Sequence, residues 1–244
     1  MKKTIGILGG MGPLATCDLF KKIVGIEQAA SDQAHLRVIV DSNTNIPDRT
    51  AAILRGGEDP LPEMCKSAGL LMQAGADVLI MPCNTAHYFY DAIVERTGAK
   101  LLHMPRETAK TLKEAGIKTA GLLATDGTIQ AGVYKSACDA LGVRLLTPSK
   151  EKQAAVMGII YDGVKATNPD YRADGFLAAV DELRAAGAET LILGCTELPL
   201  AYSYFHLSFP HVDPTLVLAV KAVEAAGGTV RAEVINDIRS CRNG

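Results

Sequence analysis

The sequence lacks any long apolar run. No stretch of its 244 residues approaches the roughly 18 consecutive apolar residues of a membrane-spanning helix. Glycines and a proline within residues 9–13 interrupt the N-terminal apolar stretch, well short of the ~7–15 apolar residues of a secretory signal peptide. We therefore expect a cytoplasmic protein.

The sequence also lacks an excess of positive charge. Its 25 Lys and Arg residues are set against 27 Asp and Glu residues, which gives a formal net charge of −2. Nucleic acids and anionic membranes are bound mainly through basic surfaces. We therefore expect neither of them as the main partner of this chain.

Cysteine and histidine spacings typical of metal sites are absent as well. The six cysteines include no CxxC pair, and the five histidines include no HxH or HExxH pattern. These absences argue against a metal cluster and against a thioredoxin-type redox motif. In a reducing compartment a cysteine is by default a small buried apolar residue. We expect that default at Cys17, Cys65, Cys138 and Cys241.

The sequence does contain short apolar runs that alternate with longer stretches of helical periodicity. The short runs are rich in Leu and β-branched residues, as in buried parallel strands, and residues 60–74 and 172–186 have helical spacing. This alternation predicts an α/β fold with parallel sheets. The expected strands span residues 4–8, 36–40, 77–81, 101–104, 118–123, 143–146, 189–193 and 211–213.

The two halves of the chain repeat each other. Residues 74–85 (AGADVLIMPCNT) match residues 186–197 (AGAETLILGCTE) at a constant offset of 112. Upstream, residues 4–8 match residues 119–123 at an offset of 115. Each half is therefore expected to form a doubly wound, Rossmann- or flavodoxin-like domain. A pseudo-twofold axis is expected to relate the two domains.

A weaker similarity between the two halves indicates where the chain passes from one half to the other. Met104-Pro105 and Asp213-Pro214 each follow a short expected strand and open a helix. The residues after Gly227-Gly228 are expected to be either a frayed tail or a short added helix. The expected division is a first domain of residues 1–99 plus 209–228 with Cys83, a second domain of residues 100–208 with Cys195, and a tail of residues 229–244.

Two cysteines occupy equivalent positions in the repeat. Cys83 and Cys195 each follow a strand directly, where the chain turns towards a helix. Open α/β sheets bind ligands at the carboxyl ends of their strands, and a helix N-terminus lowers the pKa of a nearby thiol. Inversion at an amino-acid Cα needs a base on one face and an acid on the other. We therefore predict that Cys83 and Cys195 are the catalytic pair.

Hydrogen-bond donors surround the predicted pair in the sequence. Removal of the Cα proton spreads negative charge into the α-carboxylate, which donors aimed at that group stabilise. We expect the substrate to be bound by the neighbours of the two cysteines and by the loop after strand 118–123. These residues are Asn84, Thr85, Thr196, Thr125 and Thr128.

The turn after the first strand satisfies a GxGxxA pattern at residues 10–15. A dinucleotide site is one interpretation, but the acidic residue that binds the ribose should end the second strand about 20 residues on. Asp32 precedes that strand and Asp41 lies 31 residues after Gly10. We interpret the turn as a backbone cradle for a substrate carboxylate, formed by Met11 and Gly12, and expect no cofactor.

Three motifs resemble those of the aspartate/glutamate racemase family, and most closely its aspartate racemases. They are GILGGMGP at 6–13, MPCNTAH at 81–87 and GCTEL at 194–198. The resemblance implies an amino-acid racemase that uses neither pyridoxal phosphate nor metal, has its active site between two pseudo-symmetric domains, and is commonly a homodimer. It also implies that Cys83 serves the D enantiomer and Cys195 the L enantiomer.

The same resemblance implies that a basic pair holds the distal carboxylate of the substrate. The matching residues are Arg49, in NIPDRT, and Lys165, in YDGVK, and an arginine fork suits a carboxylate. Glutamate racemases have Asp-Ser where this chain has Gly9-Gly10, and His where it has Glu197. These departures favour aspartate, and Glu197 is expected among the substrate-binding residues.

The sequence therefore predicts a cofactor-independent racemase that acts on a dicarboxylic amino acid, with aspartate as the substrate. Alternatives within the family are a broad-specificity or glutamate racemase, or an isomerase of another dicarboxylate. An alternative of another class is a non-catalytic carboxylate-binding or thiol redox protein. His87, four residues after Cys83, has two interpretations, a residue that tunes the thiol or a structural hydrogen-bonding histidine.

Overall fold

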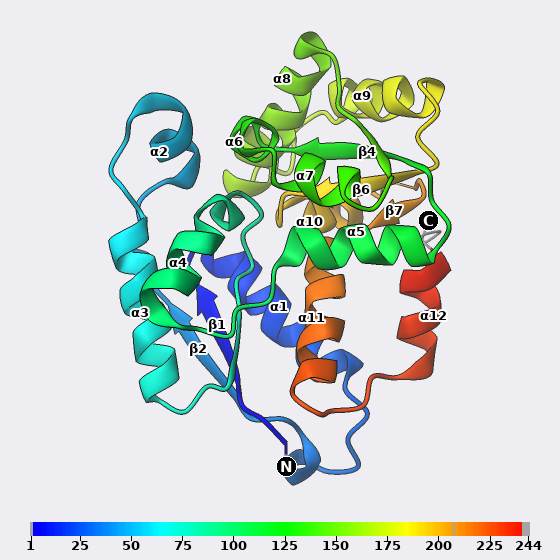
Figure 1. Ribbon diagram of the computed structural model, residues 1–244. Coiled ribbons are helices and arrows are strands. Elements are labelled where there is room, and N and C mark those ends of the chain that lie inside the picture. The colour runs from blue at the N-terminus through cyan, green and yellow to red at the C-terminus, as the bar shows by residue number, and fades with distance from the viewer. Residues whose placement is uncertain (1, 207, 241–244) are drawn as a thin grey trace.

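Two parallel β-sheets form the centre of the protein, with helices packed around them (Figure 1). The computed structural model describes residues 2–206 and 208–240. Within them the strand order is β2-β1-β3 in one sheet and β5-β4-β6-β7 in the other, with every pair parallel. The predicted α/β fold is confirmed. The strands are β1 (Ile5–Gly9), β2 (Val38–Ser42), β3 (Val78–Ile80), β4 (Thr119–Ala124), β5 (Arg144–Leu146), β6 (Thr190–Gly194) and β7 (His211–Val212).

Helices follow nearly every strand, as the alternating pattern predicts. Pro or a polar N-cap residue opens several of them; Asp48, Thr125 and Asp213 each accept a backbone N–H of the first helical turn. The α-helices are α1 (Pro13–Ile26), α2 (Arg49–Arg55), α3 (Leu61–Gln73), α4 (Tyr90–Thr97), α5 (Met104–Glu114), α6 (Asp126–Ala131), α7 (Val133–Asp139), α8 (Lys150–Gly158), α9 (Asp174–Ala185), α10 (Leu198–Tyr204), α11 (Pro214–Ala225) and α12 (Ala232–Ser240). Short segments are the 3-10 turns η1 (Asp32–Ala34) and η2 (Thr85–Phe89) and the π-helical turn η3 (Ile159–Lys165).

Both sheets are packed in the same way, which gives the sequence repeat a physical basis. Gly6 of β1 lies opposite Leu79, and a Cβ at Gly6 would stand 2.5 Å from Leu79 Cδ2. Gly121 of β4 lies opposite Leu191, and a Cβ there would stand 2.6 Å from Leu191 Cδ2. In each half, therefore, a glycine in the central strand makes room for a leucine of the strand that precedes Cys83 or Cys195.

The predicted strand at 101–104 is wrong in extent. Leu101 forms a single parallel bridge with Leu79. Helix α5 begins at Met104, with the His103 side chain accepting the Arg106 backbone N–H and Pro105 in the first turn. Because the proline ring and this cap favour a helix start, the apolar run cannot continue as a strand.

Two helices each pack into the core of the opposite half. α5 follows the first sheet, yet its Ala109 and Leu112 lie in the apolar cluster around β4. α11 follows β7 of the second sheet, yet its Leu218 and Val223 lie in the cluster around β1. The two helices also pack against each other (Figure 1). This exchange ties the halves together.

Strand pairing assigns Leu101 to the first sheet and His211–Val212 to the second. The domain division at residues 99–100 and 208–209 stays a prediction. Of the two interpretations of the tail, an added helix is confirmed for α12, whose Ile238 packs against the apolar clusters. No helix in residues 2–206 and 208–240 is long and apolar enough to cross a membrane.

We predict that G6A and G121A each lower the free energy of unfolding by about 1–3 kcal/mol, because the added methyl overpacks the sheet against a neighbouring leucine. Chemical denaturation midpoints measure the effect. G25A is the matched control, since a Cβ at Gly25 of α1 meets nothing within 4 Å and alanine has the higher helix propensity. Unchanged stability in both strand variants would contradict this packing.

Candidate active site

A pocket joins the carboxyl ends of strands from both sheets. Cys83 follows β3 of the first sheet, and Cys195 follows β6 of the second. Both cysteines line this one pocket, at the edge where open α/β sheets bind ligands. The full lining is Met11, Asp48, Arg49, Thr50, Cys83, Asn84, Thr85, Thr125, Tyr161, Lys165, Cys195, Thr196 and Glu197.

Ten of the twelve residues predicted for the site line this pocket. The other two, Gly12 and Thr128, lie beside it. A Cβ at Gly12 would stand 4.0 Å from Glu197 Oε1, and Thr128 Oγ1 lies 2.8 Å from Thr85 Oγ1. The proximity of these residues is a structural observation, whereas their catalytic and binding roles stay predictions.

Three lining residues were not predicted from the sequence: Asp48, Thr50 and Tyr161. Asp48 and Thr50 flank Arg49, so the motif that contains the arginine was the available signal. Tyr161 lies four residues before Lys165 on the same helical turn, and the lysine Nζ stands 5.6 Å from the centre of its ring. Helical spacing could have placed Tyr161 beside Lys165.

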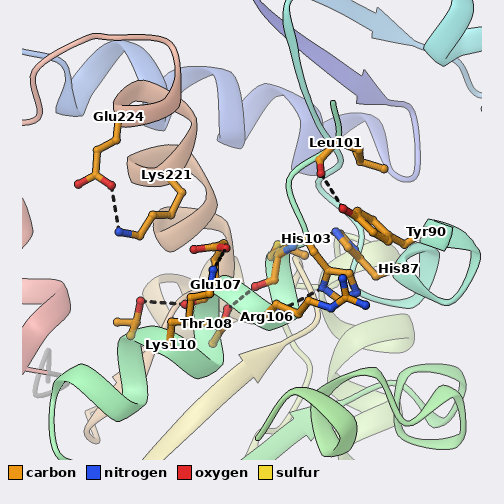
Figure 2. A network of polar contacts seen from close by, with 12 residues as sticks. His87, Tyr90, Leu101, His103, Arg106, Glu107, Thr108, Lys110, Lys221 and Glu224 are labelled. Atoms are coloured by element: carbon orange, nitrogen blue, oxygen red, sulfur yellow. Dashed lines mark hydrogen bonds and ion pairs between the residues drawn. The ribbon is translucent and has the colours of Figure 1, made fainter. Parts of the chain in front are cut away.

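His87 holds the backbone of Cys83. Its Nε2 accepts the Met104 N–H at 3.1 Å, so Nδ1 carries the ring proton and donates to the Cys83 carbonyl at 2.9 Å. Figure 2 shows the ring beside His103 and Tyr90. Burial lowers the pKa of His87 to about 4, which keeps it neutral at pH 7. Of its two interpretations, the structural one fits these contacts.

A chain of three polar side chains surrounds the second cysteine. Cys195 Sγ donates to Glu197 Oε2 at 2.9 Å, and Glu197 Oε1 forms an ion pair with Lys165 Nζ at 2.7 Å. Thr196 Oγ1 donates to the same carboxylate at 3.2 Å. The Glu197 carboxylate is thus bound by protein donors from three residues.

This arrangement controls the charges in the site. Burial, together with the adjacent carboxylate of Glu197, raises the pKa of Cys195 well above its ordinary value, so Cys195 is a thiol at neutral pH. Burial opposes ionisation of Glu197, but the ammonium of Lys165 and the hydrogen bonds outweigh it and lower the carboxyl pKa. Burial likewise opposes the charge of Lys165, but the nearby carboxylate raises the lysine pKa. Glu197 is therefore an anion and Lys165 a cation.

Arg49 opens α2 and reaches back over the turn after β1. Its guanidinium donates to the backbone carbonyls of Pro47 at 2.8 Å, Met11 at 3.2 Å and Ile46 at 3.3 Å. Its Nε is buried and has no hydrogen-bond partner among the described residues. Within residues 2–206 and 208–240 the guanidinium has no carboxylate partner. Its positive charge would therefore attract an anion in the pocket.

Three threonine hydroxyls meet where the halves touch. Thr85 Oγ1 lies 3.2 Å from Thr125 Oγ1 and 2.8 Å from Thr128 Oγ1, and the last two lie 3.1 Å apart. In such a triangle each hydroxyl proton has an internal acceptor. A substrate oxygen that accepts from Thr85 or Thr125 must therefore replace one of these bonds.

Among the described residues, no group of three or more His, Cys, Asp and Glu side chains is arranged to hold a metal ion. The expected burial of the other cysteines is confirmed for Cys138, but Cys65 is half-buried and Cys17 is exposed. The expectation is wrong for Cys17 because it lies on the outer face of α1, whose apolar residues Leu19 and Ile23 face the core. Cys241 lies outside the described residues.

Comparison with known proteins identifies relatives along nearly the whole chain. The family model described as Asp/Glu/Hydantoin racemase matches residues 8–222. The broad-specificity amino-acid racemase RacX of Bacillus subtilis is 26% identical over 225 residues, which cover 90% of this chain and 96% of the relative.

Solved structures of racemases are similar to this chain as well. The aspartate racemase of Picrophilus torridus superposes with a TM-score of 0.82 at 28% identity, covering 98% of this chain and 99% of that one. The glutamate racemase of Francisella tularensis, at 17% identity and a TM-score of 0.64, covers 92% of this chain and 81% of that one and shows the shared fold. The chain belongs to the Asp/Glu/hydantoin racemase family and is an amino-acid racemase.

Proposed function

We propose that this racemase interconverts L- and D-aspartate by a two-base proton transfer between Cys83 and Cys195, without a cofactor. The observation that carries the proposal is that both cysteines line one pocket, which also contains the cationic side chains of Arg49 and Lys165. Two thiols supply the acid and the base that inversion needs. Two cations suit a substrate with two carboxylates.

In the direction from D to L, the Cys83 thiolate takes the Cα proton. An S–H bond forms as the C–H bond breaks, and the electron pair moves into the α-carboxylate. The Cys195 thiol then gives its proton to the opposite face of Cα and is left as a thiolate. The reaction from L to D runs the same steps in reverse, with Cys195 as the base.

The contacts of Cys195 support this assignment of starting roles. Its thiol keeps its proton because the site is buried and the thiol lies against the Glu197 carboxylate at 2.9 Å. The resting protein therefore has the acid in place at Cys195 and is ready for the enantiomer that Cys83 deprotonates. By the family resemblance that enantiomer is D-aspartate.

A second candidate is a broad-specificity racemase. Lys165 is already paired with Glu197 at 2.7 Å, so a substrate with a neutral side chain leaves no unbalanced cation at that position. The Bacillus subtilis relative is named as a broad-specificity enzyme. Under this candidate Arg49 binds the α-carboxylate that every amino acid carries, and the distal group contributes little.

From the family resemblance we also propose that the active form is a homodimer, and that each chain is divided into the two domains expected from the repeat. Size-exclusion chromatography with light scattering measures the oligomeric state.

Deuterium exchange across a panel of substrates tests the proposed function. We predict that L- or D-aspartate in D2O gains Cα deuterium and loses optical rotation without added cofactor. Since one methylene changes discrimination by about 10–200-fold, kcat/KM for aspartate should exceed that for glutamate by such a factor. The equilibrium constant of a racemisation is one, so equal kcat/KM values in both directions provide an internal control. A higher value for glutamate or alanine would contradict aspartate specificity, and no exchange with any amino acid would contradict the racemase mechanism.

The substitution E197Q tests the protonation state of the Cys195 thiol. The amide keeps the shape of the side chain but removes the negative charge that raises the pKa of Cys195, and it frees the Lys165 ammonium, so the thiol pKa should fall. Ultraviolet titration of thiolate absorbance measures the shift, and the alkaline limb of the kcat/KM profile should move to lower pH with it.

The matched control is the same substitution in a C195A background, where the remaining thiols should titrate alike with Glu or Gln at position 197. An unchanged or raised Cys195 pKa in E197Q would contradict the account of this site.

A further inference from the structure

Tyr134 extends from the core of the second half to a residue of the first. It lies in α7, is 0% exposed, and has its ring in the apolar cluster around β4. Its hydroxyl donates to Asn84 Oδ1 at 2.5 Å. Asn84 directly follows Cys83 and lines the pocket, so this hydrogen bond crosses between the halves at the reaction site.

The other end of the Asn84 amide is the nitrogen Nδ2. Nδ2 is buried and has no hydrogen-bond partner among the described residues, and Asn84 as a whole is only 3% exposed. A buried N–H without a partner costs about 1–3 kcal/mol, so a folded protein keeps one mainly where a ligand will satisfy it. Arg49 Nε is a second buried donor without a partner among the described residues, and its side chain lines the same pocket.

An asparagine side chain has two nearly isosteric ends, one a donor and the other an acceptor. Rotation by half a turn would present an oxygen to the substrate carboxylate in place of an N–H, which exchanges attraction for repulsion. The orientation of this amide therefore matters for any anion bound beside Cys83, and Asn84 needs a partner that distinguishes Oδ1 from Nδ2.

We propose that Tyr134 is a positioning residue that holds Asn84 Oδ1 and thereby directs Nδ2 at the α-carboxylate of the substrate. The inference rests on the proposed function only in requiring a carboxylate beside Cys83, which every amino-acid substrate supplies. Burial raises the pKa of Tyr134 well above its ordinary value, so the phenol keeps its proton. It remains able to donate throughout the working range of pH.

The hydrogen bond from Asn84 Nδ2 is strongest when negative charge develops on the substrate carboxylate. The α-carboxylate carries more negative charge after the Cα proton leaves than before, so a correctly directed Nδ2 stabilises the transition state more than the bound substrate. Loss of the Tyr134 hydroxyl should therefore lower kcat more than it raises KM.

A double-mutant cycle between Tyr134 and Asn84 tests the inference. The kinetics use whichever amino acid the wild-type protein racemises best. We expect Y134F to lower kcat by about 2–12-fold, the value of one neutral hydrogen bond. In an N84A background the same substitution should leave kcat unchanged, since no amide remains to be directed.

Y202F is the matched control, because the Tyr202 hydroxyl also makes hydrogen bonds, to the Phe209 backbone, but does not line the pocket. It should change thermal stability without changing kcat. A wild-type kcat in Y134F, or an equal fall in kcat with and without Asn84, would overturn the inference.

The outcome is separable from that of the proposed function. If glutamate proves the better substrate, the aspartate proposal fails while the cycle still decides the role of Tyr134. If the wild-type protein racemises no amino acid, both proposals are overturned.

Discussion

The site depends on one constraint, the packing of two repeated sheets so that their carboxyl edges meet. In each half the absence of a side chain at a glycine of the central strand, Gly6 or Gly121, leaves space for a leucine of the strand that leads to a cysteine. Helices α5 and α11 each cross into the other half's core and hold the two edges at one pocket. Because the thiols follow equivalent strands, approximate symmetry of the backbone supplies a group of the same kind from each half.

The side chains around the two thiols are not symmetric. The Cys195 thiol contacts the carboxylate of Glu197, which is itself paired with Lys165. At Cys83, by contrast, the backbone carbonyl accepts a hydrogen bond from the neutral ring of His87. A symmetric scaffold with asymmetric electrostatics gives one thiol a defined proton at rest. If Cys83 and Cys195 are the two bases, as we propose, this asymmetry selects which enantiomer the resting form accepts, while the equilibrium constant of one keeps kcat/KM equal in both directions.

The sequence predicted the parts of the fold and the site that leave a local or a repeated signal. Strand periodicity and the repeat indicated both sheets, and the ends of two strands indicated Cys83 and Cys195. Arg49 and Lys165 came only from the family resemblance, and the structure finds both in the pocket. Tyr134 was not predicted, because it lies 50 residues from Asn84 in the sequence. Its position in the helical pattern is also that of an ordinary core residue. The strand expected at 101–104 failed because Pro105 and the His103 cap favour a helix start over continuation of an apolar run.

Solvent exchange by single cysteine variants tests the central claim most directly. In C83S and C195S only one thiol of the proposed pair remains, so racemisation should be lost while each variant still exchanges the Cα proton of one enantiomer with D2O. The two variants should act on opposite enantiomers, C195S on D-aspartate through Cys83 and C83S on L-aspartate through Cys195. The exchange by C83S should rise towards alkaline pH, because Cys195 must first lose its proton. Exchange of the same enantiomer by both variants, or full racemisation by either, would contradict opposed bases on the two faces of the substrate.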